Sequence, residues 1–177
     1  MLEFMNTLQG LFLLRRGPQD FPFSPTLLWG LVAVNLVFDV ALGGLLGTPG
    51  TALAASLATT AVVLGFLYLL LKSRQMLARF VQAGTALSAA ALVFSLLAIP
   101  AQVALTPMPV DPALLTEPQR LGLLFAAFLG GWSLAITAHV LRHALERSFF
   151  QGLLLALLMN FGAAIAVQLA VPAPPVP

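Results

Sequence analysis

Residues 31–47, LVAVNLVFDVALGGLLG, form an almost unbroken apolar run that contains one amide, Asn35, and one carboxylate, Asp39. A helix needs about 20 mainly apolar residues to cross the hydrocarbon core of a bilayer. The apolar character extends from residue 26 to residue 46, which meets that length. The stretch therefore predicts a transmembrane helix that carries two hydrophilic side chains inside the membrane.

The composition of the whole chain agrees with a membrane protein. Of its 177 residues, 60% are hydrophobic and 8% are charged, and the mean hydropathy is +1.00. Soluble domains carry charge on roughly a quarter of their residues, so this chain lacks the polar surface of a water-soluble globule. The absence of cysteine excludes disulfides and thiolate chemistry. The sequence lacks the basic stripe interleaved with aromatic residues that is typical of nucleic-acid binding. It also lacks serine-hydrolase, zinc-protease and P-loop motifs. We expect no enzymatic activity and no cofactor.

Five apolar stretches are long enough to span a bilayer. They cover residues 26–46, 51–71, 78–98, 121–141 and 151–171. The predicted fold is an all-α, polytopic membrane bundle of five transmembrane helices with an N-terminal interfacial amphipathic helix. We divide the chain into an N-terminal segment and linker at 1–25, a membrane domain at 26–171 and a Pro-rich tail at 172–177.

Residues typical of helix caps and turns support these boundaries. Ser24 before Pro25 is a predicted N-cap, and Thr116 to Gln119 has the spacing of a capping box. Residues 47–50 predict a tight turn between the first two spans, and Pro100 is expected to end or kink the third helix.

Basic residues predict the orientation. Seven of the eight lysines and arginines fall before span one, between spans two and three, or between spans four and five, and Arg120 alone falls on the other side. Cytoplasmic loops carry an excess of such residues. We expect a cytoplasmic N-terminus, an external C-terminal tail and insertion in a bacterial inner membrane. The predicted membrane-surface anchors are Arg15, Arg16, Lys72, Arg74, Arg142 and Arg147.

Residues 2–16 have the pattern of an amphipathic helix, with Phe4, Met5, Leu8, Leu11 and Phe12 on one face. Two positions fit that pattern equally well. The helix can lie in the cytoplasmic interface of the bilayer, or it can dock on the cytoplasmic end of the bundle.

Polar and small residues form one stripe along the first span, because Asn35, Asp39, Gly43 and Gly47 are each four residues apart. Such a stripe should face protein, since lipid offers polar groups no hydrogen bonds. The fifth span has a similar stripe of Asn160, Ala164 and Gln168. We therefore expect helices one and five to touch, with Asn35, Asp39, Asn160 and Gln168 in one intramembrane cluster and Gly43, Gly47 and Ala164 as packing residues.

Asp39 has two interpretations. No lysine, arginine or histidine lies at its depth, so we expect a protonated carboxyl that donates a hydrogen bond and clasps two helices. Intramembrane carboxyl groups also serve as proton sites, which leaves open a proton- or solute-coupled transporter.

His139, His143 and Glu146 share one helical face at the end of the fourth span. This spacing can hold a metal ion, but no further ligand is evident nearby, and we expect no metal site here.

A resemblance to a known family begins at spans three to five. LLLKSRQMLARFVQAGTALSAAALVFSLLAIP (69–100) resembles the basic linker, third helix and closing proline of bacterial Yip-family membrane proteins. GGWSLAITAHVLRHALERSFFQGLLLALLMNF (130–161) is similar to their fourth and fifth helices, and LFLLRRGPQDFPFSP (11–25) to the segment before their first. The resemblance implies five membrane helices with a cytoplasmic N-terminus. The D-L-Y-G-P signature of eukaryotic members is absent here, so GTPase binding is not carried over.

The function expected from these observations is a non-enzymatic membrane scaffold or an accessory subunit. Its partners would be the lipid bilayer, other membrane proteins or further copies of itself. The alternative is a small transporter component that uses Asp39.

Overall fold

The computed structural model describes residues 2–109 and 111–171. These residues are all-helical, and five of the helices are long and apolar enough to cross a membrane. The α-helices are α1 (Leu2–Phe12), α2 (Pro25–Leu45), α3 (Pro49–Ser73), α4 (Phe80–Ala104), α5 (Glu117–Leu145) and α6 (Phe149–Ala170). Three short 3₁₀ turns cover Pro18–Asp20, Leu77–Arg79 and Pro112–Leu114. The predicted fold class is confirmed. The tail at 172–177 lies outside the described residues.

Local signals at the helix starts act as predicted. The Ser24 hydroxyl accepts a hydrogen bond from the Leu27 amide at 3.2 Å, and the Gln119 side chain accepts one from the Thr116 amide at 2.9 Å. Both satisfy polar groups that a helix end would otherwise leave unpaired.

The third membrane helix runs further than the sequence suggested. α4 continues through Pro100 to Ala104 instead of ending at the proline. Prolines are tolerated within membrane helices because neighbouring groups re-satisfy the freed carbonyl.

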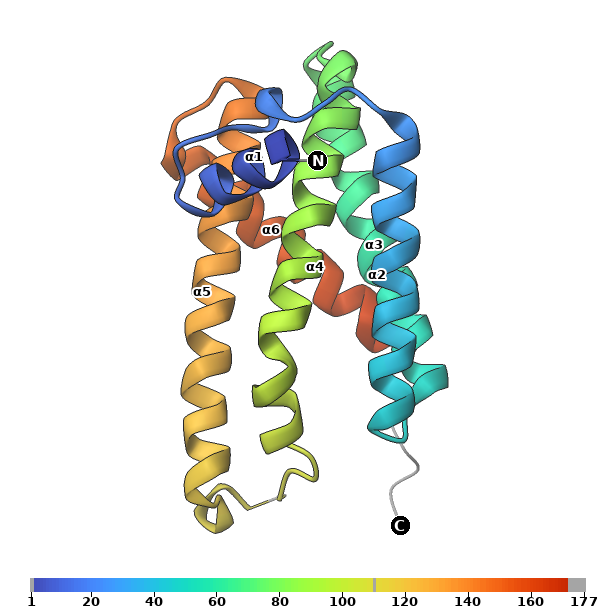
Figure 1. Cartoon of the computed structure of the whole chain (residues 1–177), viewed down its shortest axis with the longest axis vertical. Coiled ribbons are helices and arrows are strands. Elements are labelled where there is room, and N and C mark those ends of the chain that lie inside the picture. The colour runs from blue at the N-terminus through green and yellow to red at the C-terminus, as the bar shows by residue number, and fades with distance from the viewer. Residues whose placement is uncertain (1, 110, 172–177) are drawn as a thin grey trace.

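α4 lies at the centre of the bundle (Figure 1). Residues 83–90 of this helix are all buried, in the sequence AGTALSAA. α2 and α5 pack along it from two sides, and α6 crosses behind to pack on α3 and α5 (Figure 1). Small side chains let several helices approach one backbone closely, because membrane helices associate mainly through packing.

The N-terminal segment docks on the bundle, which settles the two alternatives for residues 2–16. α1 packs on α4, on the side that faces α5 (Figure 1), and Leu11 and Phe21 belong to the same buried core as the membrane helices. The Phe12 ring lies 5.2 Å from that of Phe94, halfway along α4, and Phe4 meets Phe21 edge-on at 5.7 Å. The amphipathic pattern therefore reflects burial against helices.

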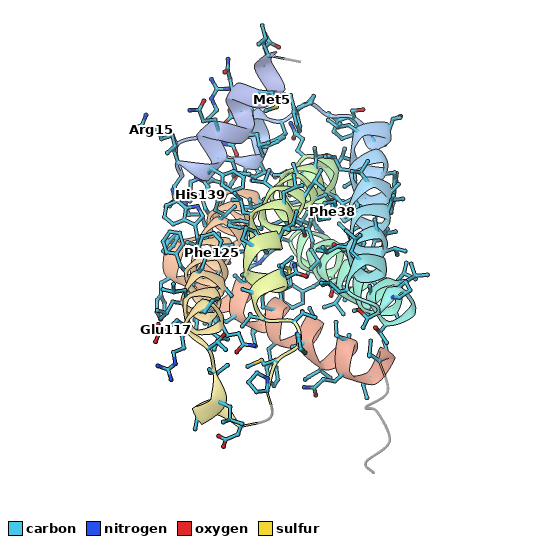
Figure 2. All side chains as sticks on the ribbon, turned by 60° about the horizontal axis from the view of Figure 1, so that its bottom comes forward. Met5, Arg15, Phe38, Glu117, Phe125 and His139 are labelled. Atoms are coloured by element: carbon cyan, nitrogen blue, oxygen red, sulfur yellow. The ribbon has the colours of Figure 1, made fainter. Side chains whose placement is uncertain are left out.

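The connections 13–24, 74–79 and 146–148 gather at one end of the bundle, together with α1 (Figure 1). We call this the basic end, because seven of the eight lysines and arginines lie on these connections or in the adjoining helix ends. Glu117 and Arg120 lie at the opposite end, at the start of α5 (Figure 2).

Gly152 sets the distance between α5 and α6. A methyl group at this position would collide with the carbonyl oxygen of Ala138 and lie 3.2 Å from the amide nitrogen of Arg142. These are backbone atoms, so they cannot rotate away as the end of a side chain can. The close approach of the two helices requires glycine here.

We expect Gly152→Ala to destabilise the protein by about 1–3 kcal/mol, because overpacking must separate α5 from α6. Thermal unfolding in one detergent, followed by tryptophan fluorescence, measures this. Gly131→Ala is the matched control, since nothing lies within 4 Å of an added methyl group there. Equal unfolding temperatures for the two variants would contradict this account of the contact.

Candidate functional site

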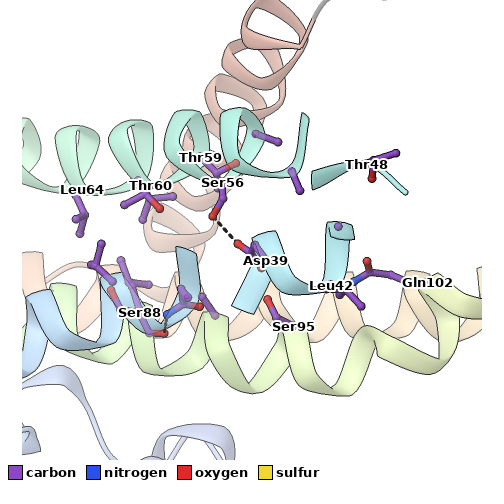
Figure 3. Close-up of a pocket in the computed structure, with 18 of the residues that line it drawn as sticks. Asp39, Leu42, Thr48, Ser56, Thr59, Thr60, Leu64, Ser88, Ser95 and Gln102 are labelled. Carbon is purple, nitrogen blue, oxygen red and sulfur yellow. Dashed lines mark hydrogen bonds between the residues drawn. The ribbon is translucent and has the colours of Figure 1, made fainter. Parts of the chain in front are cut away.

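A cavity of about 380 Å³ with a mixed apolar and polar lining lies between α2, α3 and α4, in the membrane-spanning part of the bundle (Figure 3). Its walls are apolar side chains interrupted by hydroxyl, amide and carboxyl groups. The polar lining residues are Asn35, Asp39, Thr48, Ser56, Thr59, Thr60, Ser88, Ser95 and Gln102. Because three helices contribute them, the cavity exists only in the folded bundle.

Asp39 of α2 reaches across the cavity to α3. The Ser56 hydroxyl donates a hydrogen bond to its Oδ2 at 2.5 Å (Figure 3). Ser56 is buried and Asp39 is partly buried. A hydrogen bond to a carboxyl group in such surroundings is worth more than one between neutral groups at the surface. This contact joins the first two membrane helices, with Asp39 as the acceptor of the hydrogen bond and not the donor that we expected.

Asn35, one turn earlier on α2, joins α2 to α4 instead. Its Nδ2 donates to the carbonyl oxygen of Leu31 in its own helix at 2.8 Å and to that of Ser88 in α4 at 3.0 Å. Asn35 and Asp39 therefore have separate partners on separate helices. Together they fix α2 against both of its neighbours.

The predicted cluster with the last helix is not formed. The Asn160 Nδ2 donates to the carbonyl oxygen of Ala156 in its own helix at 2.8 Å, and Asn160, Ala164 and Gln168 are exposed. α6 packs through Gly152, Ala156, Met159 and Ala163. Asn160 and Ala164 each follow one of these by one residue, which turns them about 100° away from the contact. Spacing placed the three residues on one face but did not determine where that face points.

The two glycines of the α2 stripe have different roles. Gly43 is buried, and a methyl group there would collide with the Cβ of Ala52 in α3. Gly47 lies beyond the end of α2 with a φ of +78° and nothing within 4 Å of an added methyl group. Gly47 is thus a turn residue and not the packing residue we expected, because its positive φ is one that glycine adopts without strain.

The histidine face of α5 is occupied by protein contacts. His139 Nε2–H donates to the carbonyl oxygen of Arg16 at 2.9 Å, which ties the N-terminal segment to α5. Arg142 donates to His143 Nε2 at 3.2 Å, and the Glu146 carboxylate pairs with Arg79. Within the described ranges, no group of three or more histidine, aspartate or glutamate side chains could hold a metal ion.

Arg79 is a residue whose role the sequence did not indicate. Besides pairing with Glu146, its guanidinium donates to the carbonyl oxygens of His143 and Ala144, at 3.3 and 3.2 Å. These carbonyls end α5 without partners inside the helix. Arg79 therefore caps α5 from the start of α4, and its position in a basic loop was the only available signal.

The predicted surface anchors divide into two groups. Arg15, Arg16, Lys72, Arg74 and Arg147 are exposed at the basic end, and Arg16 also donates to the Thr7 hydroxyl at 2.9 Å. Arg142 differs, because it is partly buried and its guanidinium lies 5.8 Å from the centre of the Phe149 ring. It packs between α5 and α6, where a side chain with a long apolar stem suits both neighbours.

Hydroxyl, amide and carboxyl groups interrupt the mainly apolar lining of this cavity. Its one carboxyl group is surrounded by hydroxyls and amides, and no histidine, lysine or arginine is among the lining residues. Such a set can hold a proton or a small polar solute. No family model, curated protein or solved structure matches the chain.

Ser56→Ala should destabilise the protein by about 1–3 kcal/mol, because it removes the donor to a partly buried carboxyl group. Thermal unfolding in detergent gives the measurement. Ser95→Ala is the control, since Ser95 lines the same cavity but has no side-chain hydrogen bond in the described part of the chain. A Ser95→Ala effect as large as that of Ser56→Ala would count against the Asp39 contact as the cause.

Proposed function

We propose that this protein is a non-enzymatic membrane scaffold or accessory subunit, which binds another membrane protein or a second copy of itself through α6. The observation that carries the proposal is the exposed stripe of Asn160, Ala164 and Gln168 on α6, which lies outside the face that packs on α3 and α5. Because no helix of this bundle covers the stripe, we expect a helix of another protein chain to pack on it.

Asn160 makes the strongest contribution to this proposal. It is the twelfth residue of α6, about 17 Å from the helix start and therefore deep in the bilayer. Its Nδ2 is satisfied within the helix, but no donor among the described residues reaches its Oδ1. In lipid an unsatisfied polar atom is costly, and amide side chains commonly bond between membrane helices. Ala164, one turn on, leaves room for a second backbone.

The proposal includes the orientation and the membrane. The gathering of basic residues at one end supports a cytoplasmic N-terminus in a bacterial inner membrane, with the other end of the bundle external. The relationship to the bacterial Yip family is part of the same proposal and rests on the sequence pattern.

Asn160→Leu should reduce the recovery of the partner about three- to thirtyfold, as expected for one hydrogen bond between membrane helices. Ala164→Leu should abolish recovery by blocking close approach. The measurement is quantitative mass spectrometry of proteins that co-purify with the tagged chain in mild detergent, including an untagged second copy.

Ala127→Leu is the matched control, because Ala127 is an exposed alanine on α5, away from the α6 stripe. It should leave recovery unchanged. If the protein always isolates alone, or if all three variants behave alike, the scaffold function is wrong.

The cavity around Asp39 favours one other function, a proton- or solute-coupled transporter component. Asp39→Asn distinguishes the two, because asparagine can still accept the Ser56 hydrogen bond but cannot ionise. We expect Asp39→Asn to retain both its fold and its partners. Proton flux into liposomes that contain the purified protein is the measurement, and a flux that wild type shows and Asp39→Asn lacks would establish transport instead.

A further inference from the structure

A second cavity, of about 460 Å³, opens at the basic end between α3, the end of α5 and α6. Its polar lining residues are Ser73, Arg74, Arg147 and Gln151, and its apolar lining residues are Leu70, Leu145, Leu154, Leu155 and Leu158. We infer that this cavity binds an anionic phospholipid, with Arg74 and Arg147 holding the phosphate and the leucines contacting an acyl chain.

The polar and apolar halves of the cavity lie at different depths. Arg74 directly follows α3, and Arg147 lies in the connection before α6, so both occupy the level where helices leave the hydrocarbon. Leu158 is about 14 Å further along α6 than its first residue. A phospholipid has the same arrangement, with a charged phosphate above apolar chains.

The cavity is open to the surrounding lipid. Leu154 and Leu158 line it and are 47% and 59% exposed. A lipid can therefore enter sideways from the bilayer and leave part of its chains outside. Its volume lies within the range of about 300–1,000 Å³ typical of small-ligand sites.

The positive charge of the cavity favours a lipid with an anionic headgroup. Neither arginine side chain has a hydrogen-bond or ion-pair partner among the described residues, and the neighbouring Glu146 is held by Arg79. Guanidinium groups bind phosphate oxygens in a bidentate manner, and basic pockets between membrane helices are typical sites for anionic lipids. No carboxylate lines the cavity to receive a choline or ethanolamine group. Phosphatidylglycerol or cardiolipin fits these charges better than a zwitterionic lipid.

This inference needs only membrane insertion and does not depend on the proposed partner of α6. Native mass spectrometry of the full chain in non-ionic detergent tests it, with phosphatidylglycerol and phosphatidylcholine of identical chains added in competition. We expect wild type to retain phosphatidylglycerol preferentially. The double variant Arg74→Gln/Arg147→Gln should lose about tenfold or more in affinity for this lipid.

The control is Arg15→Gln/Lys72→Gln, which removes two exposed charges from the same end but outside the cavity. It should keep the preference, and the unfolding temperatures of both double variants should stay near that of wild type, which shows that they fold. Equal retention of the two lipids by wild type, or equal loss in both double variants, would overturn the inference. Displacement of the lipid by millimolar glycerol phosphate would show a soluble-anion site and overturn it too.

Discussion

The hydrocarbon core of a bilayer offers no hydrogen-bond partners to polar atoms, and this constraint shapes both the backbone and the side-chain contacts of the chain. The backbone meets it by forming helices, in which the peptide groups bond to one another. Polar side chains satisfy the same requirement by forming hydrogen bonds with other helices. Ser56 bonds to Asp39, and Asn35 bonds to the carbonyl oxygen of Ser88. These two bonds fasten α2 to α3 and to α4. The other helix pairs are held by close packing at small residues such as Gly152, because packing is a main way in which membrane helices associate.

The N-terminal segment packs on the membrane-spanning helices and extends their common core. α1 and the turn after it cover the junction of α4 and α5, with Leu11 and Phe21 in the common core. The hydrogen bond from His139 to the carbonyl oxygen of Arg16 fixes the connection between α1 and α2 to α5. His139, which resembled a metal ligand in the sequence, therefore bonds to a backbone oxygen and ties the N-terminal segment to α5.

α2 and α6 carry nearly the same pattern of amides and small residues with opposite outcomes. On α2 the pattern faces the bundle and is satisfied there. On α6 the contact with α5 requires Gly152, whose missing side chain admits the backbone of α5. That requirement fixes the rotation of the helix and turns Asn160 outward. The Asn160 side chain is therefore left on the exposed surface of the bundle.

The sequence by itself determined the five spans, the caps at Ser24 and Thr116, and the gathering of basic residues at one end. Each of these depends on neighbours in the chain or on the thickness of the bilayer. Only the tertiary structure decided that Asp39 meets Ser56, that Asn160 faces outward, and that Arg79 caps α5. The physical reason is that lipid and the interior of the bundle are equally apolar, so hydrophobic periodicity cannot distinguish the inner face of a helix from its outer face. Rotation is set by close contacts such as those at Gly43 and Gly152, which involve residues far apart in the sequence.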